Sequence, residues 1–316
     1  MKTVGTSPES LQRGLRTAFL IGVALLLAGC STEDWPVLLP DGPIAREERE
    51  LLFAAVGLML LVVLPVYILA IIVLTRYRAS SNNPNYRPEW QSNRVDAIVW
   101  AGPAIIVVAI GTLVWDYTHR LDPYLAVEPD KTPLRVEAIA QDWKWLFIYP
   151  EQNVAVVNEL VIPTGQPVSI RITSDTVMNS LYVAGLAGQI YAMAGMQTRL
   201  NLIANDEDTY IGRNMQYSGT GFADQQFRVK VVPPAGFESW LDIVRASPDA
   251  LDGQTYAELA RPSQKVPVKY YSSAEPNLFD SIIEKYSGQP AERRTAQLDA
   301  YAGEFICETP SGRGSL

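Results

Sequence analysis

Two long apolar runs occupy the first part of the chain and set its organisation. Residues 51–74 and residues 97–115 contain no charged side chain. As a helix, each run is long enough to cross the ~30 Å hydrocarbon core of a membrane. Pro65 and Pro103 lie inside the runs, and membrane helices tolerate proline because neighbouring groups satisfy the freed carbonyl. The pattern therefore predicts a hairpin of two membrane-spanning helices.

Short stretches that alternate apolar and polar residues follow the second run. Alternation with a period of two is typical of strands with one buried face, and several such strands separated by Pro/Gly turns indicate a β-sandwich. The clearest stretches are residues 134–139, 167–173, 198–203 and 227–232. Pro233 and Pro234 then mark a boundary, and residues 237–245, 255–260 and 278–286 have the pattern of short helices. The tail from Ser287 is polar.

The N-terminus has the pattern of a secretory signal. Basic residues precede a short apolar run at 17–27, which ends in the sequence LAGC at 27–30. This ending resembles the bacterial lipoprotein cleavage box, in which Cys30 becomes the lipidated first residue. The alternative is an ordinary signal anchor with an incidental cysteine, but the chain turns polar directly after Cys30.

The distribution of charge predicts which way the hairpin is oriented in the membrane. The segment between the apolar runs, residues 75–94, carries four arginines against one acid, Glu89. Short loops rich in Lys and Arg stay cytoplasmic. Both ends of the hairpin then face outward, in agreement with a lipid on Cys30.

Composition narrows the function classes. A net charge of −8, from 26 Lys+Arg against 34 Asp+Glu, argues against nucleic acid as a partner. Two cysteines cannot form a disulfide framework. His119 is the one histidine of the sequence, which excludes sites that need two imidazoles.

We therefore expect a membrane-anchored all-β protein in four parts. These are a lipoprotein signal peptide (1–29), a lipidated N-terminus with the two-span hairpin (30–116), an exported β-domain (117–233), and a short helical C-terminal extension with its tail (234–316).

Three ordered strings carry a resemblance to a known family. They are DWKWLFIYPEQ at 142–152, VMNS at 177–180 and QIYAMAGMQTR at 189–199. Together with the signal and the hairpin, they resemble subunit II of the haem–copper respiratory oxidases, in its quinol-oxidising, cytochrome bo-type branch, over about residues 30–271. The resemblance implies that the exported domain is a cupredoxin-like sandwich.

In the cytochrome c branch of this family, the sandwich holds a dinuclear copper centre. Its ligands are a His on one loop and a Cys-x-Glu-x-Cys-x-x-x-His-x-x-Met array on another. The first His position corresponds to Asn179. With Gly212 and Gly219 kept in register, the array falls on Asn214, Gln216, Ser218, Phe222 and Gln225. Amides and a hydroxyl are hard, neutral ligands and Phe222 is none, so we expect no metal at this site.

The resemblance also implies the setting of the chain. It implies subunit II of a proton-pumping ubiquinol oxidase in the bacterial cytoplasmic (inner) membrane, with the large domain periplasmic. No cofactor is expected in this chain, because haems and copper are expected in subunit I. The implied partners are oxidase subunits I, III and IV, membrane lipid, and ubiquinol through subunit I; nucleic acid is not among them.

Asp96 stands at the inner edge of the second apolar run. The family has a glutamate at this place, which resembles the mouth of a proton-uptake route into subunit I. Carboxylates at membrane depth are costly unless they are solvated or functional. The alternative is that Asn93 or Asp96 caps the start of the helix.

The aromatic and methionine residues of the strings have ordinary explanations. We expect Trp143, Trp145, Phe147 and Tyr149 to lie on a strand and to pack the sandwich against the membrane-embedded partner. Met178, Met193 and Met196 are scattered without His or Cys, so we expect them to fill the core or an interface.

Two other functions stay open on the sequence. One is a copper-bearing cytochrome c oxidase subunit II, which the lost ligands disfavour. The other is a membrane-anchored cupredoxin-like binding or assembly protein without catalytic partners, which co-purification with a haem-bearing subunit would separate from an oxidase subunit.

Overall fold

The computed structural model describes residues 37–78 and 91–288. The signal peptide with Cys30, the middle of the loop between the apolar runs, and the tail from 289 with Cys307 lie outside the described residues. The predicted lipidation at Cys30 is among the predictions that fall there.

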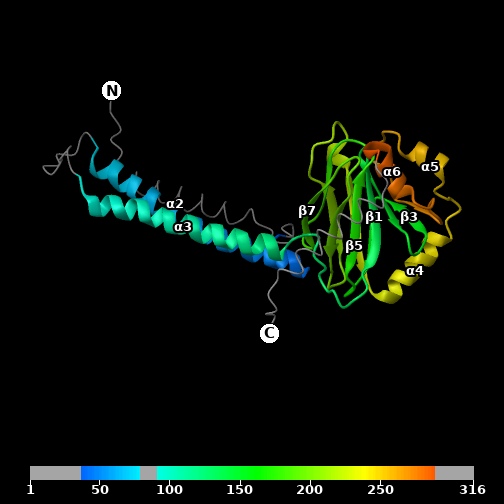
Figure 1. The fold of residues 1–316 in the computed structure, drawn as a ribbon, viewed down its shortest axis with the longest axis horizontal. Helices are drawn as coiled ribbons and strands as arrows, with labels where there is room; N and C mark the ends of the chain where they lie inside the picture. Colours follow the sequence, from blue (N-terminus) through cyan, green and yellow to red (C-terminus); the bar gives the residue numbers. More distant parts are fainter. Residues whose placement is uncertain (1–36, 79–90, 289–316) are drawn as a thin grey trace, which may run out of the picture. The chain divides into compact units, whose positions relative to one another are not determined.

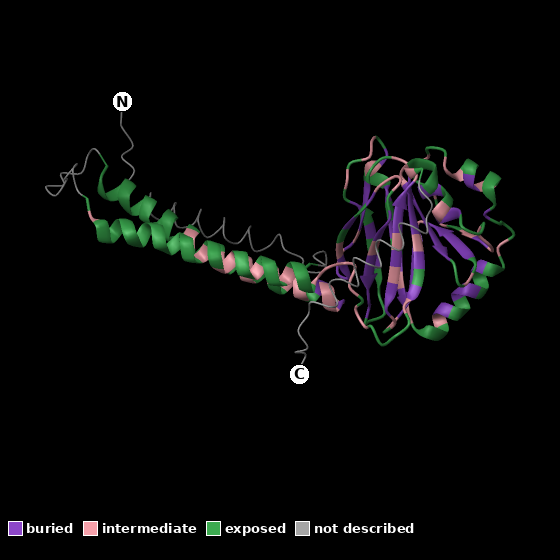
Figure 2. Ribbon diagram, viewed as in Figure 1, coloured by how far each residue is buried: buried purple, intermediate pink, exposed green. Residues whose placement is uncertain are grey.

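The two apolar runs form two helices, as predicted. Helix α2 (Pro43–Arg76) contains the first run and helix α3 (Asn93–Arg120) the second, and α3 extends beyond the predicted run at both ends. The Arg120 guanidinium lies 3.1 Å from the Glu47 carboxylate, so the end of α3 is tied to the beginning of α2 (Figure 1). Both helices are long and apolar enough to cross a membrane. No residue in the most apolar stretch of either helix is buried (Figure 2).

The following domain is a sandwich of two β-sheets. One sheet has the strand order β11-β3-β2-β1-β5-β8 and the other β4-β10-β9-β6-β7. Most neighbouring strands are antiparallel, but β1 pairs with β5 and β4 with β10 in parallel. The strands of the first sheet are β1 (Leu134–Gln141), β2 (Lys144–Tyr149), β3 (Val154–Val157), β5 (Val168–Ser174), β8 (Thr198–Leu202) and β11 (Lys269–Tyr271). Those of the second are β4 (Glu159–Pro163), β6 (Asn179–Val183), β7 (Ala187–Ala192), β9 (Thr209–Asn214) and β10 (Gln226–Val232).

The space between the sheets is filled by aromatic and aliphatic side chains. Trp145, Phe147 and Tyr149 of β2 point into it and are 0% exposed. The Phe147 and Phe227 ring centroids lie 4.9 Å apart, and the Tyr149 hydroxyl donates to the Val161 carbonyl at 2.9 Å. These three rings belong to the domain's own core, so the prediction that they pack against a membrane-embedded partner was wrong for them.

The C-terminal part adds one helix to the core between the sheets and a further layer outside the first sheet. Helices α4 (Pro234–Arg245), α5 (Gly253–Leu259) and α6 (Leu278–Ser287) confirm the three predicted helices (Figure 1). Pro234 is the first residue of α4, where its missing N–H costs no hydrogen bond. A second core joins α5, α6 and β11 to the outer face of β1, β2 and β3. The central strands of this sheet are therefore buried on both faces (Figure 2).

Candidate functional site

The positions assigned to lost copper ligands meet at one end of the second sheet. Asn179 is the first residue of β6, and Asn214 is the last residue of β9. β6 and β9 are antiparallel neighbours with Leu181 opposite Asn214, which brings the two asparagines together. The connection from β9 to β10 contains the short helix η2 (Phe222–Asp224) and returns Gln225 to the same place.

Four of the six positions form one hydrogen-bonded network. The Asn214 amide nitrogen donates to Asn179 Oδ1 at 2.7 Å and to Gln225 Oε1 at 2.8 Å. It also lies 3.2 Å from Ser218 Oγ, and the Ser218 hydroxyl donates to Gln225 Oε1 at 2.9 Å. Asn179, Asn214 and Gln225 are 0%, 4% and 1% exposed. We call these four residues the amide network.

The network is also bonded to the backbone around it. Asn214 Oδ1 accepts from the Ser180 and Gln216 main-chain N–H groups at 2.9 and 3.0 Å. The Asn179 amide donates to the Val177 carbonyl at 2.8 Å, and the Gln225 amide to the Gln141 carbonyl at 3.3 Å. Buried amides are stable only when their polar atoms are paired, and here they are.

The other two positions stay outside the network. Gln216 contributes only its main-chain N–H and is partly exposed. The Phe222 ring lies against the Tyr217 ring, with centroids 5.7 Å apart. The structure therefore brings together Asn179, Asn214, Ser218 and Gln225, and leaves Gln216 and Phe222 at the rim.

The donor set does not fit a copper pair. A dinuclear copper centre needs soft thiolates and imidazoles, whereas every polar side-chain atom of the network belongs to an amide or a hydroxyl group and already has a partner. In the part of the chain that the structure describes, no group of three His, Cys, Asp or Glu side chains could hold a metal ion. His119 lies in the last turn of α3, with its Nδ1 2.7 Å from the Trp115 carbonyl oxygen.

Trp143 contacts the loop that carries Ser218, a contact that the sequence did not reveal. It adopts a φ of 62° in the turn between β1 and β2, and its indole N–H donates to the Ser218 carbonyl at 3.1 Å. A Cβ on Gly221 would lie 2.4 Å from the indole ring. Only glycine lets the ring approach this closely, so Gly221 and Trp143 together fix the loop between β9 and β10.

The methionines of the strings are not core residues. Met178 and Met196 are 39% and 50% exposed, and Met193 is half-buried. The core part of their predicted role was therefore wrong for Met178 and Met196, which lie on loops at the surface.

Asp96 lies in the first turn of α3 and is exposed. Helix α3 begins at Asn93 after Ser92, and the Asp96 main-chain N–H donates to the Ser92 carbonyl at 3.0 Å. Ser92 occupies the cap position, without a side-chain cap bond. The alternative that Asn93 or Asp96 caps this helix was therefore wrong, although a carboxylate in the first turn still suits the helix dipole.

Comparison with known proteins gives consistent matches. The family model described as COX Aromatic Rich Motif matches residues 245–289. Cytochrome bo(3) ubiquinol oxidase subunit 2 of Pseudomonas putida is 45% identical over 84% of this chain and 83% of that protein. Ubiquinol oxidase subunit 2 of Acetobacter aceti is 41% identical over 87% and 90%. Quinol oxidase subunit 2 of Bacillus subtilis is 38% identical over 77% and 76%.

Proposed function

Because this chain belongs to the family of quinol oxidase subunit 2 proteins, we propose that it is a copper-free subunit II whose amide network stands where a related branch holds copper. The complex oxidises ubiquinol, reduces dioxygen to water and moves protons across the membrane. The observation that carries the proposal is the mutual hydrogen bonding of Asn179, Asn214, Ser218 and Gln225.

The chain then acts as a scaffold that holds no redox centre. Haems and the copper of the oxygen-reducing centre belong to subunit I, which also receives ubiquinol. Subunits III and IV and membrane lipid complete its surroundings. The exposed apolar faces of α2 and α3 support this arrangement, because faces of this kind are stable only against lipid or other membrane helices.

The membrane placement follows from the same assignment. The hairpin lies in the inner membrane, the sandwich is periplasmic, and Cys30 carries the lipid after removal of residues 1–29. The arginines at the inner ends of the helices, Arg76, Arg78 and Arg94, support a cytoplasmic loop. The four segments 1–29, 30–116, 117–233 and 234–316 keep these roles. The intact mass of the mature chain tests the cleavage and the acylation, and an unmodified N-terminus at Met1 would refute both.

Asp96 delivers protons to subunit I in this proposal. Its place in the first turn of α3 and its exposure support a group that can exchange protons with the cytoplasm. It is one methylene shorter than the glutamate of the family pattern.

The choice of electron donor tests the proposal. The purified complex is mixed anaerobically with ubiquinol or with reduced cytochrome c, and haem reduction is followed by absorbance. We expect rapid reduction by ubiquinol and none by cytochrome c, because the subunit has no copper to accept electrons from a protein donor. Rapid reduction by cytochrome c would contradict the copper-free assignment.

A further inference from the structure

The described part of the aromatic-rich segment, residues 245–288, is built into the sandwich. Tyr256, Phe279 and Ile283 belong to the buried cluster on the outer face of the first sheet. Strand β11 pairs with β3, with Tyr271 opposite Ala155. The segment therefore covers a sheet face and a sheet edge that would otherwise be exposed.

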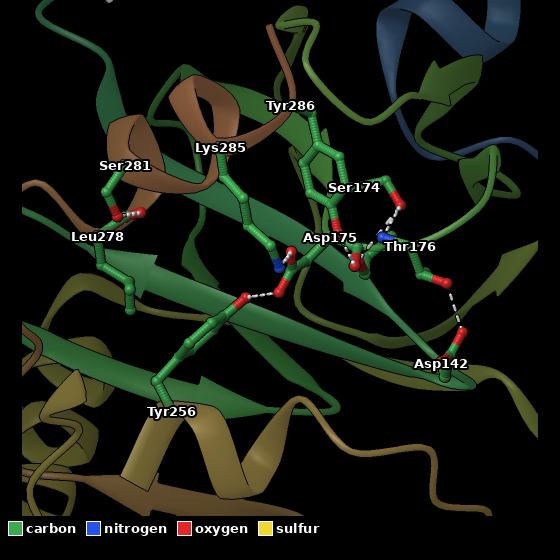
Figure 3. Close-up of polar contacts among 10 residues, drawn as sticks. Asp142, Ser174, Asp175, Thr176, Tyr256, Leu278, Ser281, Lys285 and Tyr286 are labelled. Atoms are coloured by element: carbon green, nitrogen blue, oxygen red, sulfur yellow. Dashed lines mark hydrogen bonds and ion pairs between the residues drawn. The ribbon is translucent and has the colours of Figure 1, made fainter. Parts of the chain in front are cut away.

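Three side chains of this segment converge on one residue outside it, Asp175. The Tyr256 hydroxyl donates to Asp175 Oδ2 at 2.7 Å, and the Lys285 ammonium to Oδ1 at 2.8 Å. The Tyr286 hydroxyl donates to the Asp175 main-chain carbonyl at 2.9 Å (Figure 3). The Asp175 side chain is only 4% exposed. Hydrogen bonds to an ionised group are stronger than neutral ones, so Asp175 attaches the segment firmly to this part of the chain.

Asp175 lies at the start of the loop that carries the first lost copper position. This β5–β6 loop comprises residues 175–178, between the end of β5 and Asn179. The Ser174 hydroxyl donates to the Val177 carbonyl at 2.8 Å, and Asn179 donates to the same carbonyl. The Thr176 hydroxyl donates to the Asp142 carboxylate. The loop therefore contacts the aromatic-rich segment through Asp175 and the amide network through Asn179.

The segment also contacts the loop between β7 and β8, directly through Tyr286 and indirectly through Arg171. Arg171 of β5 donates to Asp280 of α6 at 2.7 Å and to Gln197 of this loop at 2.7 Å. The backbone of Tyr286 approaches Gly195 so closely that a Cβ there would lie 3.2 Å from it.

A third attachment is the turn between β1 and β2. Lys144 is 0% exposed, and its ammonium donates to the Arg261 carbonyl at 2.9 Å and to the Ser263 hydroxyl at 2.8 Å. Burial lowers the pKa of Lys144. The neighbouring Trp143 reaches Ser218 of the network, so this turn also connects the segment to the site.

We propose that residues 245–288 are an internal strap that fixes the β5–β6 loop and, through it, the amide network. The free energy of metal binding stabilises the ordered conformation of the loops around a bound metal. Neutral hydrogen bonds add little net stability, because they replace hydrogen bonds to water. Once a metal is lost, the loops need another source of order, and the strap supplies it through Asp175. The statement that the strap replaces the ordering effect of a metal rests on the proposed function. The statement that the strap fixes the β5–β6 loop does not.

The test is amide hydrogen exchange on the intact complex in detergent. The variant Tyr256→Phe, Lys285→Met, Tyr286→Phe removes the strap's three contacts with Asp175 and leaves the loop sequence unchanged. The reporters are the N–H groups of Asp175 and Ser180, which donate to Ala140 and Asn214. We expect these amides to exchange at least about tenfold faster in the variant, because local opening then no longer breaks charged contacts.

Lys269→Met is the matched control. Lys269 also lies in the strap, and its ion pair at 3.0 Å joins it to Asp249 of the same segment. We expect the loop amides to exchange within about twofold of the wild-type rate in this variant, because no contact to the loop is lost.

The proposal is overturned if the triple variant leaves exchange across residues 174–180 unchanged, whether or not α6 itself exchanges faster. It is also overturned if every strand of the sandwich exchanges faster to the same degree, because the effect is then global. If the triple variant does not assemble, Lys285→Met alone is measured, with an expected increase of about threefold at the same amides; no increase overturns the proposal. Copper bound by the chain would refute the proposed function without altering this result.

Discussion

The Asn214 side chain uses both of its polar atoms to join parts of the chain that are far apart in sequence. Its nitrogen reaches Asn179 and Gln225, and its oxygen accepts from the main chain of Ser180 and Gln216. A neutral amide can make these contacts without a metal because it is both donor and acceptor. A carboxylate could not, because it would face the two amide oxygens.

Asn214→Ala is therefore expected to destabilise the sandwich. The substitution leaves Asn179 Oδ1 and the Ser180 N–H without a partner and removes one of the two hydrogen bonds that Gln225 Oε1 accepts. We expect a cost of about 2–4 kcal/mol in the free energy of unfolding. Arg213→Ala, on the adjacent exposed position of β9, is the control and should change it by less than about 0.5 kcal/mol. Denaturant unfolding followed by tryptophan fluorescence measures both. Equal midpoints would show that the network adds nothing to stability.

Glu137 makes the stability of the domain depend on pH. Burial raises the pKa of its carboxyl to about 7, and the Arg171 guanidinium at 2.9 Å only partly offsets this. The folded chain then binds this proton more tightly than the unfolded chain does. The resulting stabilisation is complete below the ordinary carboxyl pKa and is lost as pH rises through about 7.

We expect Glu137→Gln to abolish this pH dependence. In the wild type, Glu137 should lower the free energy of unfolding by about 2–3 kcal/mol between pH 4.5 and pH 8. In the variant this decrease should be absent, while the Arg171 contact with Asp280 is kept. Unfolding midpoints measured across this range provide the check, and parallel curves for the two proteins would contradict the raised pKa.

At the scale of elements, alternation predicted four strands of the sandwich but missed β9, in which buried and exposed residues also alternate. β1, β5, β8 and β10 fall where the sequence placed them. β3 and β4 carry no such alternation, because every residue in them is buried. The outer layer of α5, α6 and β11 causes this for β3, and a local pattern cannot reveal a layer supplied by a distant part of the chain.

The candidate site was predictable only in part, for a similar reason. The sequence grouped Asn179, Asn214, Ser218 and Gln225 as members of one site, and the structure brings these four residues together. The partners Trp143 and Gln141 come from another strand pair, and nothing in their local sequence points to the loop. The aromatic residues of segment 245–289 were a visible signal, but their contact with Asp175 depends on tertiary packing.

Gly221→Ala should disturb the loop between β9 and β10. The added methyl group would overlap the Trp143 ring, so the ring must move away and weaken its bond to Ser218. We expect a loss of about 1–3 kcal/mol in the free energy of unfolding and a shift of tryptophan fluorescence. Thr220→Ala, at the exposed neighbouring position, is the control. A stable Gly221→Ala protein with unchanged fluorescence would contradict the described packing.

On the scale of the whole molecule, the chain combines a membrane hairpin with a β-sandwich that carries the amide network at one end of its second sheet. The hairpin provides anchorage and Asp96. The sandwich provides a folded domain with its own buried core. This division agrees with a subunit that supports catalysis in a partner.

The role of Asp96 is tested by comparing quinol oxidase turnover between variants whose complexes assemble in equal amounts. Asp96→Asn keeps size and hydrogen bonding but removes the proton site, so quinol oxidase turnover should fall at least about threefold. Asp96→Glu should be nearly silent, because it keeps a carboxylate in the first turn of α3. Undiminished turnover in a fully assembled Asn variant would leave Asp96 with a structural role alone.

The copper content of the isolated, full-length chain tests the central claim most directly. The chain is purified, incubated with copper, desalted, and examined by metal analysis and near-infrared absorption. We expect no bound copper and no near-infrared charge-transfer band, because the amides at Asn179, Asn214 and Gln225 and the hydroxyl of Ser218 offer no soft ligand. Stoichiometric copper with such a band would contradict the account.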